Sequence, residues 1–149
     1  MAKWVTDQVA VGGIAISPTN WRELVQETGI SAVVNLRSEY QDRFSPPMPI
    51  AYLWLPVEDH SEPSCEQLRL GAEFIDTAVQ NGQRVLVHCK MGIGRSPTMA
   101  AAYLILTGLT VDEAIRQVKG SPKPVHGPVI SRVTLNDFAA ILKTNRQAS

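Results

Sequence analysis

The chain has 149 residues, of which 44% are hydrophobic and 19% are charged, and this composition is typical of a globular protein rather than of a disordered or collagen-like one. Its 14 basic and 14 acidic side chains give a formal net charge of zero, which argues against a partner bound by bulk electrostatics, such as nucleic acid or an anionic membrane. Because this length is enough for a hydrophobic core, we expect a single domain over residues 1–149, and a monomer.

The cysteine content and the N-terminus indicate a reducing compartment. Only Cys65 and Cys89 are present, and the first residues lack the charged-then-apolar pattern of a signal peptide. The longest uncharged stretch, residues 96–110, is too short to cross a bilayer and contains polar side chains. We therefore expect reduced thiols, no membrane span and a cytoplasmic location.

Four short apolar runs predict the strands of a sheet. The valine-rich runs are continuous rather than alternating, which is typical of strands that are buried on both faces. The predicted strands are residues 9–11, 31–36, 51–57 and 84–87.

Capping patterns predict where helices begin between and after these runs. Asn20, Ser64 and Thr110 each stand three positions before an acidic or amide side chain, which is the pattern of a capping box. The predicted helices are residues 20–28, 64–80, 97–106, 110–119 and 134–142, with a proline-rich connection at 120–129. The helix at 97–106 is apolar nearly all round, so we expect it to lie at the centre of the fold.

Strands that alternate with helices predict an α/β fold in which helices flank a central, mostly parallel, twisted sheet on both faces. In such sheets ligands bind beyond the carboxyl ends of the strands. Arg37, residues 58–60 and residues 88–89 follow three of the predicted strands and carry charged or nucleophilic side chains. We expect these side chains to meet at one edge of the sheet.

Residues 88–97, HCKMGIGRSP, join a predicted buried strand to the predicted central helix. Gly92 and Gly94 allow the backbone to curl so that amides point inward at a helix N-terminus, an arrangement that binds anions. Arg95 adds a planar pair of donors that matches two oxygens of a phosphate. Nearby cations and helix N-termini lower the pKa of a cysteine from about 8.5 to roughly 3.5–7.5. We therefore expect a thiolate at Cys89 that attacks the phosphorus atom of a bound phosphate.

This segment carries a family resemblance. Residues 88–96 match the signature H-C-x-x-G-x-G-R-[S/T], so the chain resembles the cysteine-dependent dual-specificity phosphatases of the protein tyrosine phosphatase superfamily. The likeness extends from residues 9–12 through the helix after the signature. It implies a protein tyrosine phosphatase-like fold and hydrolysis of phosphotyrosine, phosphoserine and phosphothreonine through a cysteinyl-phosphate intermediate. It also implies a phosphorylated protein or peptide as the partner, and no metal or other cofactor.

The resemblance further implies a role for each residue of the signature. Cys89 matches the nucleophile, Arg95 the phosphate clamp and Ser96 the hydroxyl that helps the thiolate leave. His88 matches a residue behind the substrate-binding layer that orients the loop. The substrate-binding residues that the resemblance implies are Lys90, Met91, Gly92, Ile93, Gly94 and Arg95. The Lys90 side chain could equally point to solvent and take no part in binding.

A general acid is also required, because an alkoxide or phenoxide leaves poorly unless it is protonated. In the family this acid is an aspartate on a loop before the cysteine, and Asp59 fits that position. Glu58 is the rival residue. Adjacent side chains of an extended segment point in opposite directions, so at most one of the two faces the pocket.

Several alternatives stay open at this point. A phosphatase of phosphoinositides or other non-protein substrates would use the same loop, although only Lys90 adds a cation within it. A non-catalytic pseudophosphatase would keep the phosphate site but lose the nucleophile or the acid. A thiol redox or sulfur-transfer protein would explain Cys89 but would give Arg95 no role in the reaction.

Three further features have open roles. Cys65 is either an inert thiol or a redox partner of Cys89. Arg37 either lines the rim of the site or lies in a solvated loop with Glu39 and Asp42. The three tryptophans are expected to serve packing rather than substrate binding.

Overall fold

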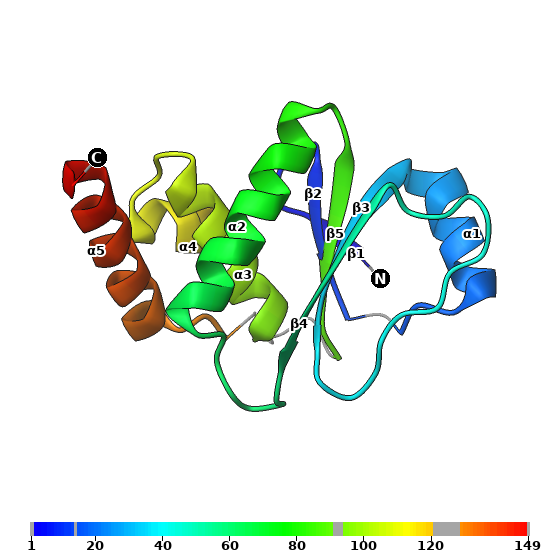
Figure 1. Cartoon of the computed structure of the whole chain (residues 1–149), viewed down its shortest axis with the longest axis horizontal. Helices are drawn as coiled ribbons and strands as arrows, with labels where there is room; N and C mark the ends of the chain where they lie inside the picture. Colours follow the sequence, from blue (N-terminus) through cyan, green and yellow to red (C-terminus); the bar gives the residue numbers. More distant parts are fainter. Residues whose placement is uncertain (1, 14, 91–93, 121–128, 149) are drawn as a thin grey trace.

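The computed structural model describes residues 2–13, 15–90, 94–120 and 129–148 of the chain. Its strands are β1 (Ala2–Trp4), β2 (Val9–Gly12), β3 (Ile30–Arg37), β4 (Ala51–Val57) and β5 (Arg84–His88). They form one five-stranded sheet in the order β1-β2-β5-β3-β4 (Figure 1). β1 runs antiparallel to β2, whereas all other neighbours are parallel. The predicted α/β fold with a mostly parallel sheet is confirmed.

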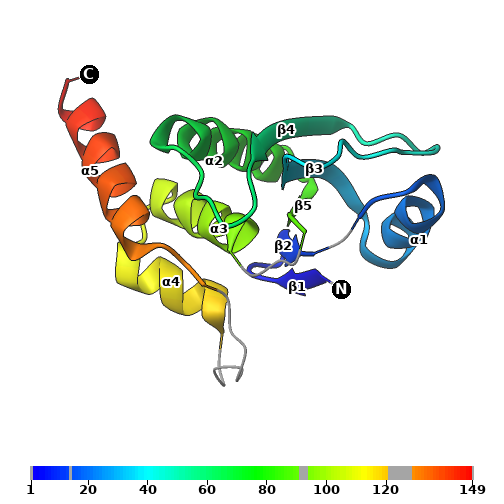
Figure 2. The same cartoon turned by 90° about the horizontal axis from the view of Figure 1, so that it is seen from below.

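The helices flank the sheet on both faces, as the sequence predicts. They are α1 (Pro18–Thr28), α2 (Cys65–Gln80), α3 (Arg95–Leu106), α4 (Val111–Lys119) and α5 (Arg132–Ala148). α1 lies on one side of the sheet, and α2 to α5 lie on the other (Figure 2). Every side chain of α3 from Arg95 to Ile105 is buried, which confirms the central helix. Within the described residues, none of the helices combines the length and apolar character needed to span a bilayer.

The sheet separates two hydrophobic cores, and this arrangement explains the continuous apolar runs. On the central strand β5, Val85 and Val87 belong to the core beneath α2 and α3, whereas Leu86 belongs to the core beneath α1. Side chains of a strand point alternately to opposite faces. Each strand with a core on both faces therefore has to be apolar at successive positions.

The predicted start of α1 is wrong by a few residues. Ser17 is the N-cap residue, because its Oγ accepts a hydrogen bond from the Asn20 amide and the Asn20 side chain accepts one from the Ser17 amide. Pro18 occupies the first helical turn, where its missing N–H and fixed φ suit a helix start. Asn20 is therefore the third helical residue of a capping box and not the cap.

The bounds of α5 also differ from the prediction of 134–142. The helix begins at Arg132 and continues to Ala148. At its start, the Ser131 Oγ accepts a hydrogen bond from the Thr134 amide at 3.3 Å. The added last turns carry mostly exposed side chains, so they lack the apolar periodicity from which a helix is predicted.

Parallel pairing brings three strand ends to one edge of the sheet. Arg37 is paired with Val57, while Asn35 and Gly12 are both paired with His88. β3 lies between β4 and β5 in the sheet, and these three strands end at this one edge. The predicted convergence of the strand ends is confirmed, and it positions the site described below.

Gly71 on α2 is expected to be essential for the close contact between α2 and α3. A Cβ added at this position would lie 2.5 Å from both Cε and Sδ of Met99 and 3.3 Å from Cδ1 of Leu55. Met99 is fully buried, so the end of its flexible side chain would have to shift within the packed core. We predict that Gly71→Ala lowers the free energy of unfolding by about 1–3 kcal/mol, as measured by urea denaturation.

The matched control is Thr77→Ala, on the exposed side of the same helix. It is expected to change the free energy of unfolding by no more than about 0.5 kcal/mol. A Gly71→Ala variant as stable as the control would contradict the close packing of the two helices.

Candidate active site

Cys89 follows β5 directly and lines a cavity of about 360 Å³. The other described lining residues come from the loop after β4, the start of α3 and the segment before α5, and include residues 59–63, Arg95 and Val129. The Cys89 side chain is only 2% exposed. Its Sγ lies 3.2 Å from the Oγ of Ser96, which is fully buried. The Cys89 thiol and the Ser96 hydroxyl, which the family resemblance predicts to act together, are therefore in hydrogen-bond contact.

The guanidinium of Arg95 is buried where α3 meets the ends of β3 and β4. Its Nη1 donates hydrogen bonds to the Val57 carbonyl at 2.6 Å and to Glu39 Oε1 at 2.9 Å. Nη1 is also 3.5 Å from the Leu36 carbonyl, and Nη2 donates to Glu39 Oε2 at 3.3 Å. The Oδ1 atom of Asp59 lies 3.7 Å from Nη2. These acceptors fix the plane of the guanidinium beside the cavity.

Glu39 is an ion-pair partner of Arg95 rather than a solvated loop residue. The hydrogen bond from Arg95 is the main reason that the pKa of Glu39 falls to about 2. Burial alone would lower the pKa of Arg95, but the hydrogen bond to Glu39 and the neighbouring negative charges outweigh it and raise that pKa. Both partners therefore stay charged at neutral pH, and the pair is permanent under ordinary conditions.

Asp42, three residues further along the same loop, holds His88. The Asp42 Oδ2 lies 2.6 Å from the His88 Nε2, and the two side chains are 2% and 0% exposed. The loop itself is tied down by Asn35, whose Nδ2 donates to the Tyr40 carbonyl at 2.9 Å and to the Tyr52 hydroxyl at 3.0 Å. The His88 ring, next to the nucleophile candidate in the chain, is thus fixed in orientation.

Of the two candidate acids, Asp59 is the one that lines the cavity. Its side chain is 45% exposed, and its Oδ1 accepts a hydrogen bond from the His60 amide at 3.0 Å. Glu58 lies in the described part of the chain but outside the cavity lining, and it is exposed. The turn is closed by the Ser61 amide, which donates to the Glu58 carbonyl at 3.0 Å. Asp59 therefore has the access to a bound ligand that Glu58 lacks.

The N-terminus of α3 lacks the side-chain cap that three other helices have. α1, α2 and α4 each begin with a capping box. α3 has Gly94 as its N-cap and no hydrogen bond from a capping side chain. Amides of a first helical turn that no side chain caps are available to an anion. Met91, Gly92 and Ile93 lie outside the described residues.

Two other candidate residues are absent from the described lining of the cavity. Lys90 is exposed, so a role in binding stays a prediction. Arg37 is buried, with its guanidinium 4.9 Å from the centre of the Tyr40 ring and its Nε 4.0 Å from Glu39 Oε2. The prediction that Arg37 lies in a solvated loop is therefore wrong, and a place at the rim of the site stays a prediction.

Cys65 has the properties of an inert thiol. It is the first residue of α2 and is partly buried, and both it and Cys89 are free cysteines. Burial raises the pKa of the Cys65 thiol, and the charge of Asp137 raises it further. A raised pKa leaves less of the reactive thiolate. Among the described residues, histidine, cysteine and carboxylate side chains form no group of three or more that could hold a metal ion.

Glu39 and Asp42 are the site residues that the sequence analysis missed. Their only signal in the sequence is that two acidic residues follow a buried strand whose end reaches the predicted site. A loop of this composition is equally typical of a solvated turn. The distinction depends on Arg95 and His88, which are far away along the chain.

Known proteins share both the sequence and the fold. Residues 15–133 match the family described as "Dual specificity phosphatase, catalytic domain". The chain is 34% identical over 100 residues to Dual specificity protein phosphatase 1-A of Xenopus laevis, which covers 66% of this chain and 27% of that protein. It is 38% identical over 134 residues to Dual specificity protein phosphatase 26 of Bos taurus, covering 86% of this chain and 61% of that protein. The chain thus spans less than two thirds of each relative.

Solved structures of phosphatases have a similar fold. The crystal structure of PTPMT1 superimposes with a TM-score of 0.82 at 26% identity and covers 100% of both chains. PTPMT1 in complex with PI(5)P gives a TM-score of 0.80 at 24% identity over 97% of this chain and 98% of that one. The crystal structure of human DUSP28 gives a TM-score of 0.78 at 25% identity over 97% of this chain and 99% of that one.

The pair between Glu39 and Arg95 predicts how stability changes with pH. The pKa of Glu39 is about 2 in the folded protein against an ordinary value of 4.5, so its stabilising charge is fully present above pH 4.5 and is lost as the pH falls towards 2. We predict that Glu39→Gln is less stable than the wild type at neutral pH. This difference should shrink as the pH falls through that interval, in thermal unfolding followed by circular dichroism.

Glu73→Gln is the matched control, because Glu73 is exposed and its ion pair within the described residues is with Arg69 one helical turn away, at 3.6 Å. Its stability is expected to follow that of the wild type at every pH. A difference between Glu39→Gln and the wild type that stays constant down to pH 2 would argue against the ion pair.

Proposed function

Because the chain belongs to the dual-specificity phosphatases, as the family match over residues 15–133 shows, we propose that it hydrolyses phosphomonoesters of phosphorylated proteins or peptides. The observation that carries this proposal is that Cys89 and the fixed Arg95 guanidinium line one cavity, with the Ser96 hydroxyl buried behind the Cys89 sulfur and in contact with it. A turn that served only the fold would not need a cysteine and an arginine that both line a cavity. Monomeric state and cytoplasmic location stay predictions from the sequence.

In the first step the substrate phosphate occupies the cavity beside the start of α3. The donors of Arg95 and the uncapped amides of the first turn of α3 bind its oxygens and stabilise the negative charge of the transition state. The Cys89 thiolate attacks the phosphorus atom. The S–P bond forms while the bond between phosphorus and the ester oxygen breaks, and that oxygen takes a proton from Asp59.

In the second step water hydrolyses the phosphocysteine. Asp59, now ionised, takes a proton from the water while the water oxygen attacks phosphorus. The S–P bond breaks, inorganic phosphate is released, and the electron pair returns to the sulfur. Ser96 supports this departure, because its hydroxyl is 3.2 Å from the sulfur and can donate a hydrogen bond to the thiolate.

The binding of the Arg95 guanidinium to Glu39 and to backbone carbonyls has a function in this scheme. Donors that are fixed before the substrate arrives need no reorganisation during the reaction, and such preorganised charge is the largest contribution in many enzymes. Within the described part of the chain, Nη1 binds Val57 and Glu39 and Nη2 donates one hydrogen bond to Glu39, so we assign Nε and the remaining N–H of Nη2 to the phosphate. We therefore assign Glu39 a positioning role and Arg95 direct contact with the phosphate.

Phosphoinositides are the alternative substrate class, since the fold of PTPMT1, crystallised in complex with PI(5)P, is similar. Proteins are favoured here because acidic side chains, Asp59 and Glu62, line the described cavity, and they would repel a polyanionic headgroup. Comparison of kcat/KM on phosphopeptides and on PI(5)P distinguishes the two classes.

The nucleophile is tested with Cys89→Ser. We predict that the wild type hydrolyses p-nitrophenyl phosphate at the same rate with and without EDTA, and that the substitution lowers kcat by about a thousandfold or more. The control Cys65→Ser is expected to keep full activity, because Cys65 is not part of the cavity. A wild type that binds phosphopeptides but shows no turnover would identify a pseudophosphatase instead.

The general acid is tested with Asp59→Ala. An alkyl ester such as a phosphoserine peptide needs protonation of its leaving oxygen, so we predict a loss in kcat of about a hundredfold or more. p-Nitrophenyl phosphate has a good leaving group and should lose far less. Glu58→Ala is the neighbouring control and should resemble the wild type. If Glu58→Ala shows the selective loss instead, Asp59 is not the acid.

A further inference from the structure

A second recess lies on the opposite side of the sheet from α2 and α3. It is a groove of about 340 Å³ between the edge strand β1 and the helix α1. Ala2 and Trp4 line it from β1, and Leu24 is among the residues that line it from α1. α1 covers this side of the sheet (Figure 2), and the groove opens along its border with β1. We call this recess the β1–α1 groove.

The floor of the β1–α1 groove is apolar and incompletely covered. Ile16 is buried, but Trp4 remains 38% exposed. The Arg84 guanidinium lies 5.4 Å from the centre of the Trp4 ring and donates a hydrogen bond to the Thr28 carbonyl at 2.7 Å. Trp4 is therefore held in place, with apolar surface still accessible.

In the described part of the chain, the outer edge of the sheet beside this floor has no further strand partner. β1 is the terminal strand of the sheet and pairs only with β2 among the described strands. Its side chains alternate, so that Ala2 and Trp4 face the groove while Lys3 reaches the other side and donates to the Val118 and Lys119 carbonyls. An open edge strand beside an apolar groove can accept an extended peptide, which adds main-chain hydrogen bonds to the burial of its side chains.

The described lining of the groove carries two acidic side chains and no basic one, while the Arg84 guanidinium beside it is bound to the Thr28 carbonyl and to the Trp4 ring. Glu23 and Glu27 are exposed and stand one turn apart on α1, lining the groove together. Neither forms an ion pair within the described residues. Like charges at this spacing destabilise a helix slightly, so a cation brought by a partner would relieve the repulsion. The charge of the rim thus selects for a basic ligand.

We propose that the β1–α1 groove binds an extended segment of a partner protein in which an apolar side chain is flanked by lysine or arginine. The apolar side chain packs on Trp4 and Leu24. The basic side chain pairs with Glu23 and Glu27, and the peptide backbone extends the sheet at β1. This interaction is independent of the phosphatase chemistry proposed above.

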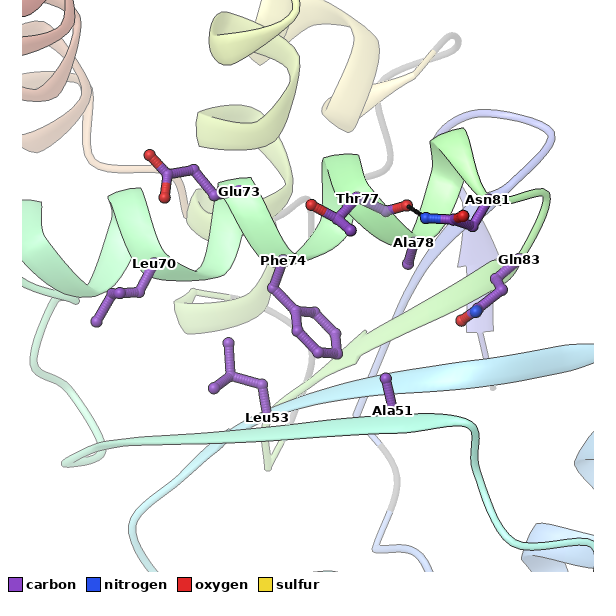
Figure 3. A pocket seen from close by; sticks show the side chains of 9 residues that line it. All are labelled: Ala51, Leu53, Leu70, Glu73, Phe74, Thr77, Ala78, Asn81 and Gln83. Carbon is purple, nitrogen blue, oxygen red and sulfur yellow. Dashed lines mark hydrogen bonds between the residues drawn. The ribbon is translucent and has the colours of Figure 1, made fainter.

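A second groove provides a contrast within the same molecule. It has about 400 Å³ and lies between α2 and the other edge strand, β4, where Leu53 and Phe74 point towards one another (Figure 3). Its only charged lining residue among those described, Glu73, is paired with Arg69. This groove therefore offers apolar surface without a free charge, and it serves as an internal control.

The test begins with selection of peptides from a phage-displayed random library against the full chain. We expect enriched sequences in which lysine or arginine adjoins an apolar residue, and affinity that falls as NaCl is added. By fluorescence anisotropy with one enriched peptide, Glu23→Gln together with Glu27→Gln should weaken binding by about tenfold. The control substitution Glu73→Gln, in the other groove, should leave the affinity for the peptide unchanged.

Phosphatase activity of both variants should equal that of the wild type, which shows that they are folded. Failure to enrich any basic peptide, or binding that survives the double substitution, would overturn the proposal. The proposal would also be overturned if light scattering shows that the wild type is a dimer and that the double substitution dissociates it. The groove would then be occupied by a second copy of the chain. None of these outcomes affects the catalytic proposal, which is tested at Cys89 and Asp59.

Discussion

The active site depends on how one buried positive charge is held. Arg95 is only 4% exposed, and a buried guanidinium is costly unless its donors find acceptors and its charge finds a partner. The acceptors are the carbonyls at the ends of β3 and β4, and the partner is Glu39. They come from two separate parts of the chain, the end of β3 with its following loop and the end of β4, so the guanidinium is fixed only when the parallel sheet has assembled. Loss of that assembly would leave the guanidinium of Arg95 without its acceptors.

The loop after β3 holds both sides of the signature segment. Glu39 binds Arg95 at the start of α3, and Asp42 binds His88 at the end of β5. Asn35, which is fully buried on β3, secures this loop through Tyr40 and Tyr52. A rigid strand thus supports the loop, and the loop supports the residues around Cys89. Supporting contacts of this kind determine whether a catalytic group stays in its productive geometry.

Much of the fold could be predicted because its signals are local. β4 has the bounds predicted for residues 51–57, and the capping boxes at Ser64 and Thr110 start α2 and α4. The prediction for α1 is wrong because Asn20 can cap a helix or occupy the third helical position, and the choice depends on Ser17. Local patterns thus identify an element more reliably than its first residue.

The sequence by itself determined the α/β architecture and identified Cys89, Arg95, Ser96 and Asp59 as the candidate residues. It could do so because strand periodicity, helix caps and the signature segment are each encoded within short stretches of chain. Only the tertiary structure decided that Glu39 forms an ion pair with Arg95 and that Asp42 contacts the His88 ring, so that neither carboxylate is a solvated loop residue. The reason is physical: whether a carboxylate is solvated or bound depends on which side chain is folded against it, and both partners are more than forty positions away in the chain.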